Sequence, residues 1–212
     1  MRNATEISAK LAEYLLEIKA VKLQPNDPFT WSSGWKSPIY CDNRVTLSYP
    51  NIRYFIKTAL ADAVKANFSE ATALCGVATA GIAIGGLVAD ELAMPYAYCR
   101  PKPKAHGMKN QLEGRLEEGA KVLVVEDLIS TGGSSLKVVD YLRNAGYEVI
   151  GMISIFTYGF DIAANNFSNA NCAHFSLGSY SELIEVAKTM DYVSEEHLPA
   201  LAEWRKDPEN WG

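Results

Sequence analysis

Two carboxylates and a cluster of hydroxyls lie close together in the middle of this 212-residue sequence. Glu126 and Asp127 follow the apolar run 122–125, and the segment 130–134 (STGGS) begins two apolar residues later. Glycines let backbone N–H groups approach a phosphate closely, and hydroxyls add donors. The carboxylates would repel that phosphate, so they must face another part of the ligand, such as the vicinal hydroxyls of a sugar. The spacing therefore indicates a ligand that carries both a phosphate and a sugar.

The neighbouring residues predict the elements that position this cluster. The run 122–125 is apolar without alternation, which is typical of a strand buried on both faces of a parallel sheet. We expect this strand to end at the acid pair, at the carboxyl edge where open parallel sheets bind ligands. Residues 135–145 are compatible with a helix. An ordinary strand-to-helix turn with a capping serine is the alternative, whereas the absence of a lysine after the glycines excludes the nucleoside-triphosphate loop.

A basic segment could supply the charge that balances such a ligand. Residues 100–109 (RPKPKAHGMK) contain four cations and a histidine without an acid. Two prolines and a glycine prevent a continuous helix, so the cations are expected on a mobile loop. A solvated basic surface loop is the alternative interpretation. Because the ligand and the acid pair are both anionic, we expect this loop to close over the site.

Composition limits the class of protein. With 48% hydrophobic and 21% charged residues, the chain is typical of one globular domain with a sizeable core. The net charge of −5 gives no general attraction to nucleic acid or to an anionic membrane. Four widely separated cysteines favour buried free thiols over disulfides or zinc. The chain shows neither an apolar span nor a signal peptide, so we expect a cytoplasmic protein.

Strand and helix patterns alternate from residue 50 onward, which predicts an α/β fold with an open, mostly parallel twisted sheet flanked by helices. The expected helices are 5–21, 50–66, 82–92, 135–145, 183–190 and 194–206, and the expected strands are 73–77, 96–99, 122–125 and 148–156. Segment 28–44 predicts a hairpin with its turn at 33–36, and a polar loop is expected before the capping box of Ser179 and Glu182. The whole chain, 1–212, is expected to be one domain with a hood at 1–48.

Three motifs carry a resemblance to known proteins. One of them resembles a motif of the type I phosphoribosyltransferases in general, and the three together resemble the orotate phosphoribosyltransferases within that family. The run 122–134 is similar to the phosphoribosyl-pyrophosphate signature of that family. The hood pattern is matched by Thr30, Ser33, Gly34, Ser37, Pro38, Tyr40, Asp42 and Arg44, and the catalytic loop by Arg100, Lys102, Lys104, His106 and Gly107. The chain departs from some members at Ser32, Ala80 and Pro101, where they have lysine, and near Tyr158, where they have an orotate-binding arginine.

The resemblance implies an activity and a set of contacts. The reaction would be transfer of the 5-phosphoribosyl group from phosphoribosyl pyrophosphate to orotate, giving orotidine 5′-monophosphate and pyrophosphate in pyrimidine synthesis. Lys104, Glu126 and Asp127 would be catalytic, and Ser130 would also contact orotate. The residues implied in binding phosphoribosyl pyrophosphate are Arg100, Lys104, His106, Glu126, Asp127, Leu128, Ile129, Ser130, Thr131, Gly132, Gly133 and Ser134. The turn 78–81 would face the pyrophosphate.

The resemblance also implies a cofactor and an assembly. Mg²⁺ would come with the substrate rather than be held directly by protein ligands. The chain would form a homodimer in which the loop 100–118 closes on the partner's active site, and neither nucleic acid nor membrane is an expected partner. Two alternatives are a phosphoribosyltransferase for another base and a non-catalytic regulator that binds nucleotide or RNA.

Overall fold

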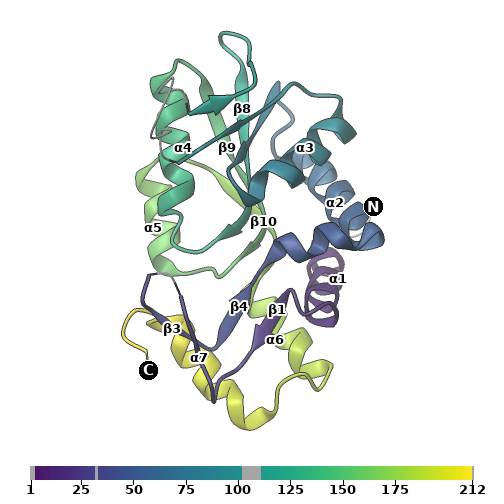
Figure 1. The fold of residues 1–212 in the computed structure, drawn as a ribbon, viewed down its shortest axis with the longest axis vertical. Coiled ribbons are helices and arrows are strands. Elements are labelled where there is room, and N and C mark those ends of the chain that lie inside the picture. Colours follow the sequence, from purple (N-terminus) through teal and green to yellow (C-terminus); the bar gives the residue numbers. More distant parts are fainter. Residues whose placement is uncertain (1–2, 32, 102–110, 212) are drawn as a thin grey trace. The chain divides into compact units, whose positions relative to one another are not determined.

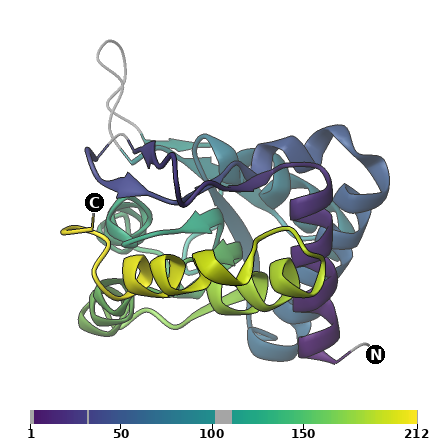
Figure 2. The same cartoon turned by 90° about the horizontal axis from the view of Figure 1, so that it is seen from below.

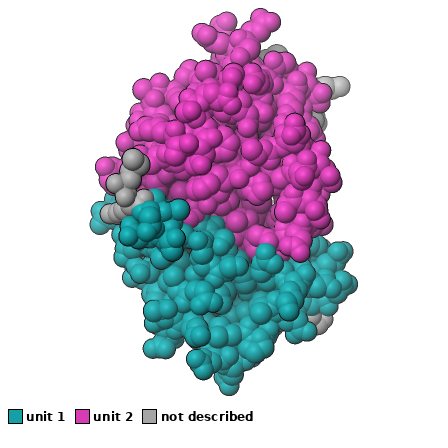
Figure 3. All heavy atoms as spheres, turned by 180° about the vertical axis from the view of Figure 1, so that it is seen from behind, with its two compact units in different colours: residues 1–53, 178–212 teal, residues 54–177 magenta. Residues whose placement is uncertain are grey.

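The computed structural model describes residues 3–31, 33–101 and 111–211 (Figure 1). The chain divides into two compact units, coloured separately in Figure 3: residues 1–53 with 178–212, and residues 54–177. The helices are α1 (Ala4–Glu17), α2 (Pro50–Asn67), α3 (Ala80–Leu92), α4 (Gly133–Asn144), α5 (Asp161–Asn169), α6 (Tyr180–Thr189) and α7 (Leu198–Lys206), with 3-10 helices η1 (Asn43–Ser48) and η2 (Glu195–His197).

A six-stranded sheet with the order β10-β9-β8-β5-β6-β7 forms the centre of unit 54–177. Its strands are β5 (Ala73–Val77), β6 (Tyr96–Cys99), β7 (Leu112–Glu113), β8 (Lys121–Ile129), β9 (Glu148–Thr157) and β10 (His174–Ser179). The pairs β5–β6, β5–β8 and β8–β9 are parallel, and β7 runs antiparallel to β6. The predicted α/β class with a mostly parallel sheet is confirmed.

Helices cover both faces of this sheet. Helix α3 lies on one face, and α4 and α5 lie on the other, in both Figure 1 and Figure 2. The central strands are apolar because they are covered from both sides, and every residue of β5 and of the run 122–125 is buried. The predicted strand at 122–125, buried on both faces, is therefore correct.

The interval 160–178 differs from its prediction. A polar loop is predicted there, but the structure contains α5 and β10. Helix α5 has the sequence DIAANNFSN and buries only Ala163 and Phe167, so its apolar stripe is too sparse to reveal a helix. Strand β10 lies at the edge of the sheet and buries only part of its residues. Both elements depend on tertiary contacts more than on local pattern.

Unit 1–53 with 178–212 contains the predicted hairpin. Strand β2 (Phe29–Thr30) pairs with β3 (Lys36–Ser37), and β1 (Val21–Leu23) pairs with β4 (Ile39–Cys41), both antiparallel. Gly34 has a φ of 92° in the turn. The indole of Trp204 in α7 donates a hydrogen bond of 3.1 Å to the carbonyl of Lys36, so the C-terminal helix supports the hairpin. The capping box of Ser179 and Glu182 is also confirmed.

Among the residues that the structure describes, none of the helices is both long and apolar enough to cross a membrane.

Candidate active site

The acid pair lies where β8 loses one of its two neighbours. Pairing with β5 ends at Val125, opposite Gly76, whereas pairing with β9 continues to Ile129, opposite Thr157. The prediction that the strand ends at the acids was therefore wrong, because β9 supports it for four residues beyond Val125. The acids still lie at the carboxyl edge with respect to β5, and this edge is where open parallel sheets bind ligands.

Glu126 is buried, with 6% of its surface exposed, and both of its carboxyl oxygens accept hydrogen bonds. The hydroxyl of Ser135 donates to Oε2 at 2.7 Å, and the backbone N–H of Asp127 donates to Oε1 at 3.0 Å. Burial, followed by the neighbouring charge of Asp127, raises the pKa of Glu126 well above its usual value of 4.5. Glu126 thus links the strand end to the first turn of α4.

The other residues of the signature differ in exposure. Asp127 and Leu128 are half-buried, whereas Ile129 is fully buried. The carbonyl of Ile129 accepts hydrogen bonds from the N–H of Tyr158 at 3.1 Å and from the hydroxyl of Thr157 at 3.3 Å. Any ligand contact by Ile129 is therefore restricted to its backbone, while the side chain of Asp127 can reach a solute.

The hydroxyl and glycine loop leads directly into α4. Ser130 and Thr131 are half-buried, Gly132 is the N-cap with a φ of 78°, and α4 begins at Gly133, two residues before the predicted start. Gly133 and Ser134 are exposed. The first amides of a helix have no partner within the helix, and no side chain caps this one. The segment 132–134 therefore presents backbone donors at the positive end of the helix dipole.

The second strand-to-helix turn, residues 78–81, lies against the same part of β8. A Cβ atom added to Gly81 would be 2.5 Å from the carbonyl oxygen of Val125 and 3.4 Å from the Cα of Glu126. Only glycine permits this approach, so the start of α3 packs directly on the strand that carries the acid pair. The turn predicted to face pyrophosphate and the acid pair are thus neighbours.

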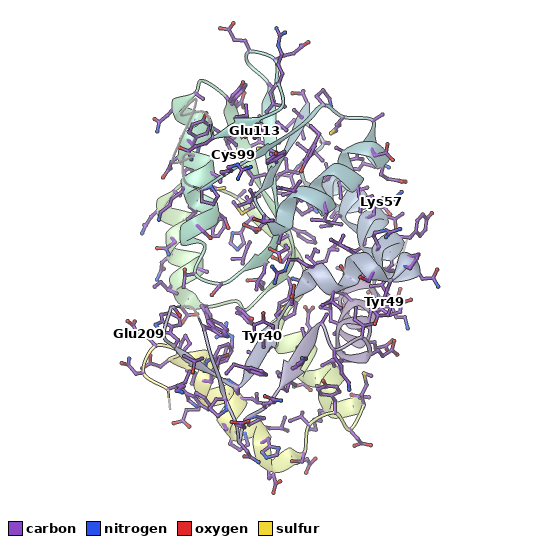
Figure 4. All side chains as sticks on the ribbon, viewed as in Figure 1. Tyr40, Tyr49, Lys57, Cys99, Glu113 and Glu209 are labelled. Carbon is purple, nitrogen blue, oxygen red and sulfur yellow. The ribbon has the colours of Figure 1, made fainter. Side chains whose placement is uncertain are left out.

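Arg100, at the start of the basic segment, is bonded to Gln111, the first described residue after it. The N–H of Arg100 donates to the carbonyl of Gln111 at 3.0 Å, and the side-chain amide of Gln111 donates to the carbonyl of Arg100 at 2.7 Å. Glu113, which Figure 4 labels near Cys99, has an oxygen 3.8 Å from Nε of Arg100. Lys102, Lys104 and His106 lie outside the described residues, so their predicted roles stay predictions.

A surface hollow among the described residues lies away from this site. It has a volume of about 250 Å³ and is lined by Thr72, Ala73, Pro95, Glu117, Glu118, Gly119 and Ala120. These residues precede or begin β5, β6 and β8, so the hollow is at the amino edge of the sheet. The candidate site is at the carboxyl edge, where the charged and hydroxyl groups converge.

A metal ion at the site would need oxygen ligands. No cluster of three or more histidine, cysteine or acidic side chains that could hold a metal occurs among the described residues. Asp127 offers a half-buried carboxylate beside the helix start. Mg²⁺ is usually bound by one or two carboxylates together with substrate phosphates and water, so this donor set fits Mg²⁺ that arrives with a phosphorylated ligand.

Two residues that bond to the site, Asn166 and Ser135, were not predicted from the sequence. The side-chain amide of Asn166 in α5 donates a hydrogen bond of 2.9 Å to the carbonyl of Thr131. Ser135 lies one residue beyond the predicted loop and bonds Glu126. Neither position had a signal in the sequence, because Asn166 belongs to the segment expected to be a loop and Ser135 was expected to be an ordinary helical residue.

The fold and the strand-end site define a phosphoribosyltransferase, and comparison with known proteins agrees. A family model described as the phosphoribosyl transferase domain matches residues 48–169. An orotate phosphoribosyltransferase of Porphyromonas gingivalis is 53% identical over 202 residues, which cover 95% of this chain and 96% of that protein. One from Listeria innocua is 53% identical over 206 residues, covering 97% and 99%. The chain belongs to the orotate phosphoribosyltransferase family.

Solved structures show the same fold. The crystal structure of an orotate phosphoribosyltransferase from Aeropyrum pernix is 28% identical with a TM-score of 0.74, and the match covers 87% of this chain and 99% of that chain. The UMP synthase of Leishmania donovani has a TM-score of 0.80 at 23% identity, covering 93% of this chain and 42% of that chain. The second likeness concerns the fold alone.

Proposed function

We propose that the chain transfers the 5-phosphoribosyl group from phosphoribosyl pyrophosphate to orotate, with release of pyrophosphate, as a step of pyrimidine synthesis. Relatives named orotate phosphoribosyltransferase are about half identical to this chain over nearly its full length. One observation carries the proposal: the buried carboxyl of Glu126, the half-buried carboxyl of Asp127 and the backbone amides at the start of α4 lie together at the end of one strand. This arrangement suits a ligand with a ribose and a 5′-phosphate.

The reaction needs no nucleophilic side chain. As the bond between C1 of ribose and pyrophosphate breaks, positive charge develops on the ribose ring and negative charge on the leaving group. Catalysis is then mainly electrostatic stabilisation by groups fixed before the reaction. Asp127 would accept hydrogen bonds from the ribose hydroxyls and stabilise the cationic ring. Glu126 would share this role, and its oxygens also accept hydrogen bonds from the backbone N–H of Asp127 and the hydroxyl of Ser135.

The phosphate groups would contact backbone donors and cations. The amides and hydroxyls of residues 130–134 would bind the 5′-phosphate, and Ser130 would also face orotate. The turn 78–81 would face the pyrophosphate, with Arg100, Lys104 and His106 balancing its charge. Bound Mg²⁺ would neutralise pyrophosphate charge and help to orient its oxygens.

The assembly and location are also part of the proposal. In a homodimer, the loop 100–118 would close on the partner's active site. A cytoplasmic location is supported by the buried thiols of Cys75, Cys99 and Cys172, because such free thiols are typical of reducing compartments. Burial raises the pKa of each of these thiols, which keeps them protonated.

A turnover assay tests the proposed reaction. Purified protein with phosphoribosyl pyrophosphate and Mg²⁺ is expected to consume orotate, followed by its absorbance, and to leave uracil and purines unchanged. Turnover of another base in place of orotate would redirect the proposal to that base. Release of no pyrophosphate with any base would instead support a non-catalytic nucleotide-binding protein.

The Lys104→Ala variant tests the basic loop. It is expected to lower kcat by about two to three orders of magnitude, as for the loss of one transition-state donor, with a much smaller effect on orotate binding. A near-normal kcat would remove the loop from the mechanism. Mixing Lys104→Ala with Asp127→Asn chains is expected to restore part of the activity, because one site of each mixed dimer would then combine an intact loop with an intact acid pair.

A further inference from the structure

Helix α5 contacts the phosphate loop through two consecutive residues. The side-chain amide of Asn166 donates to the carbonyl of Thr131 at 2.9 Å. The ring of Phe167 packs under Gly132 so closely that a Cβ atom there would be 2.6 Å from the ring. The phosphate loop, residues 130–134, is therefore held by a polar contact and an aromatic contact that come from outside its own strand and helix.

The polar contact sets the direction of a peptide plane. In a trans peptide the carbonyl and the following N–H point in opposite directions. Because the carbonyl of Thr131 points at Asn166 in α5, the N–H of Gly132 points away from α5. The plane precedes the αL residue Gly132, which is the N-cap of α4, so its orientation also sets the entry into the first turn. Rotation of this plane would change the arrangement of the donors in the loop.

Helix α5 is also tied to the far end of α4. The guanidinium of Arg143, in the last turn of α4, donates to the carbonyls of Ala170 at 2.6 Å and Asn171 at 2.9 Å, directly after α5. The residue before the N-cap of α4 and the last turn of α4 are thus both bonded to the C-terminal part of α5 and the residues that follow it. This bracing makes α5 a fixed support against which Asn166 can hold the loop.

We propose that Asn166 is a positioning residue for the phosphate loop, which fixes the Thr131–Gly132 peptide so that the loop donors converge on the 5′-phosphate. The inference rests on the proposed function, in which this loop binds that phosphate. Asn166 itself touches no substrate. Its loss should weaken recognition of the 5′-phosphate and leave recognition of pyrophosphate, which belongs to another turn, unchanged.

Three variants of the full chain separate this role from a general structural one. Asn166→Ala removes the side chain, and Asn166→Leu keeps a similar volume without a donor, so that packing on α5 is preserved. Asn165→Ala is the matched control, because Asn165 is the preceding residue of the same helix and is exposed. Titration calorimetry with ribose 5-phosphate, and separately with pyrophosphate and Mg²⁺, measures the two recognition events.

Both Asn166 variants are expected to bind ribose 5-phosphate about tenfold more weakly, which corresponds to one hydrogen bond, and to bind pyrophosphate within about twofold of the wild type. Asn165→Ala should match the wild type for both probes. Unchanged affinity for ribose 5-phosphate in the Asn166 variants, or an equal loss for both probes, would overturn the inference alone. A wild-type chain that binds neither probe would overturn the proposed function together with it.

Discussion

The molecule contains two strand-to-helix turns at the carboxyl edge of one sheet, and they are held in different ways. The turn 78–81, between β5 and α3, is fixed by close backbone packing, since Gly81 lies directly on β8. The loop 130–134, between β8 and α4, is packed on the ring of Phe167 and is held in addition by two hydrogen bonds, from Asn166 to Thr131 and from Ser135 at its end to Glu126. Close packing positions both turns, and side-chain hydrogen bonds add to it in the second, so substitutions that remove those hydrogen bonds should affect the second turn alone.

The largest effect is expected from Gly81→Ala, which breaks the first turn. The new Cβ would meet the backbone of β8 at Val125, which cannot move aside as a side chain can. We expect the free energy of unfolding to fall by about 1–3 kcal/mol, the usual cost of overpacking. Turnover should fall as well, because the displaced backbone adjoins Glu126. Urea denaturation and the orotate assay measure the two effects.

Gly86→Ala is the matched control in the same helix. Its Cβ would lie 3.6 Å from the ring of Tyr96, an ordinary contact. Alanine is favoured over glycine within a helix, so stability should rise by about 0.5–1 kcal/mol. If the two glycine variants had the same stability, close packing of the first turn would not be what holds it.

Ser135→Ala tests one of the hydrogen bonds that hold the loop 130–134. The substitution removes the donor to Oε2 of the buried Glu126. Leaving a buried acceptor without its partner should lower the free energy of unfolding by about 1–2 kcal/mol. The neighbouring Ser134→Ala serves as the stability control, because Ser134 is exposed at the start of the same helix. Equal stability of the two serine variants would contradict a role of this bond in holding α4.

A change in pH dependence, measured with Glu126→Gln, tests the acid to which Ser135 is bonded. The pKa of Glu126 is raised in the folded state by burial and by Asp127, so the folded chain holds this proton more tightly than the unfolded chain. Stability from this group is therefore greatest at low pH and declines as pH rises from about 4.5 to the raised pKa, by at most about 1.4 kcal/mol per pH unit.

Glutamine at this position cannot titrate, so the stability of Glu126→Gln relative to the wild type should increase with pH over the same window. Thermal or urea unfolding of both proteins between about pH 5 and 8 measures the difference, because this range begins near the ordinary pKa of a carboxyl group and extends above it. Parallel pH curves for the two proteins would show that Glu126 has the same proton affinity in the folded and unfolded chains.

Local pattern predicted the parts of the fold that local pattern determines. The buried run 122–125, the strand at 96–99 and the capping box of Ser179 all follow from residue type and spacing. The length of β8 could not be predicted, since it depends on pairing with β9. The start of α4 at Gly133 depends on the αL conformation of Gly132, a position where the ring of Phe167 from another helix leaves no room for a Cβ.

The candidate site divides in the same way. The acid pair and the hydroxyl loop are contiguous, so their chemistry is visible in the sequence. The sequence does not reveal that Glu126 is buried while Asp127 is half-buried, because Glu126 is bonded to Ser135 only in the folded chain. Asn166 lies 35 residues from its partner Thr131, and only the packing of α5 brings them together.

The reciprocal hydrogen bonds between Arg100 and Gln111 have a consequence for engineering. They hold Arg100 and Gln111 side by side at the sheet edge, so any sequence placed between these two residues begins and ends at neighbouring points. For a flexible insert between two fixed ends, each doubling of its length costs only about 0.6 kcal/mol in closure entropy. Replacing this segment with one of another length should leave the sheet intact, which makes it a natural place to graft sequences from relatives and compare their turnover on a common scaffold.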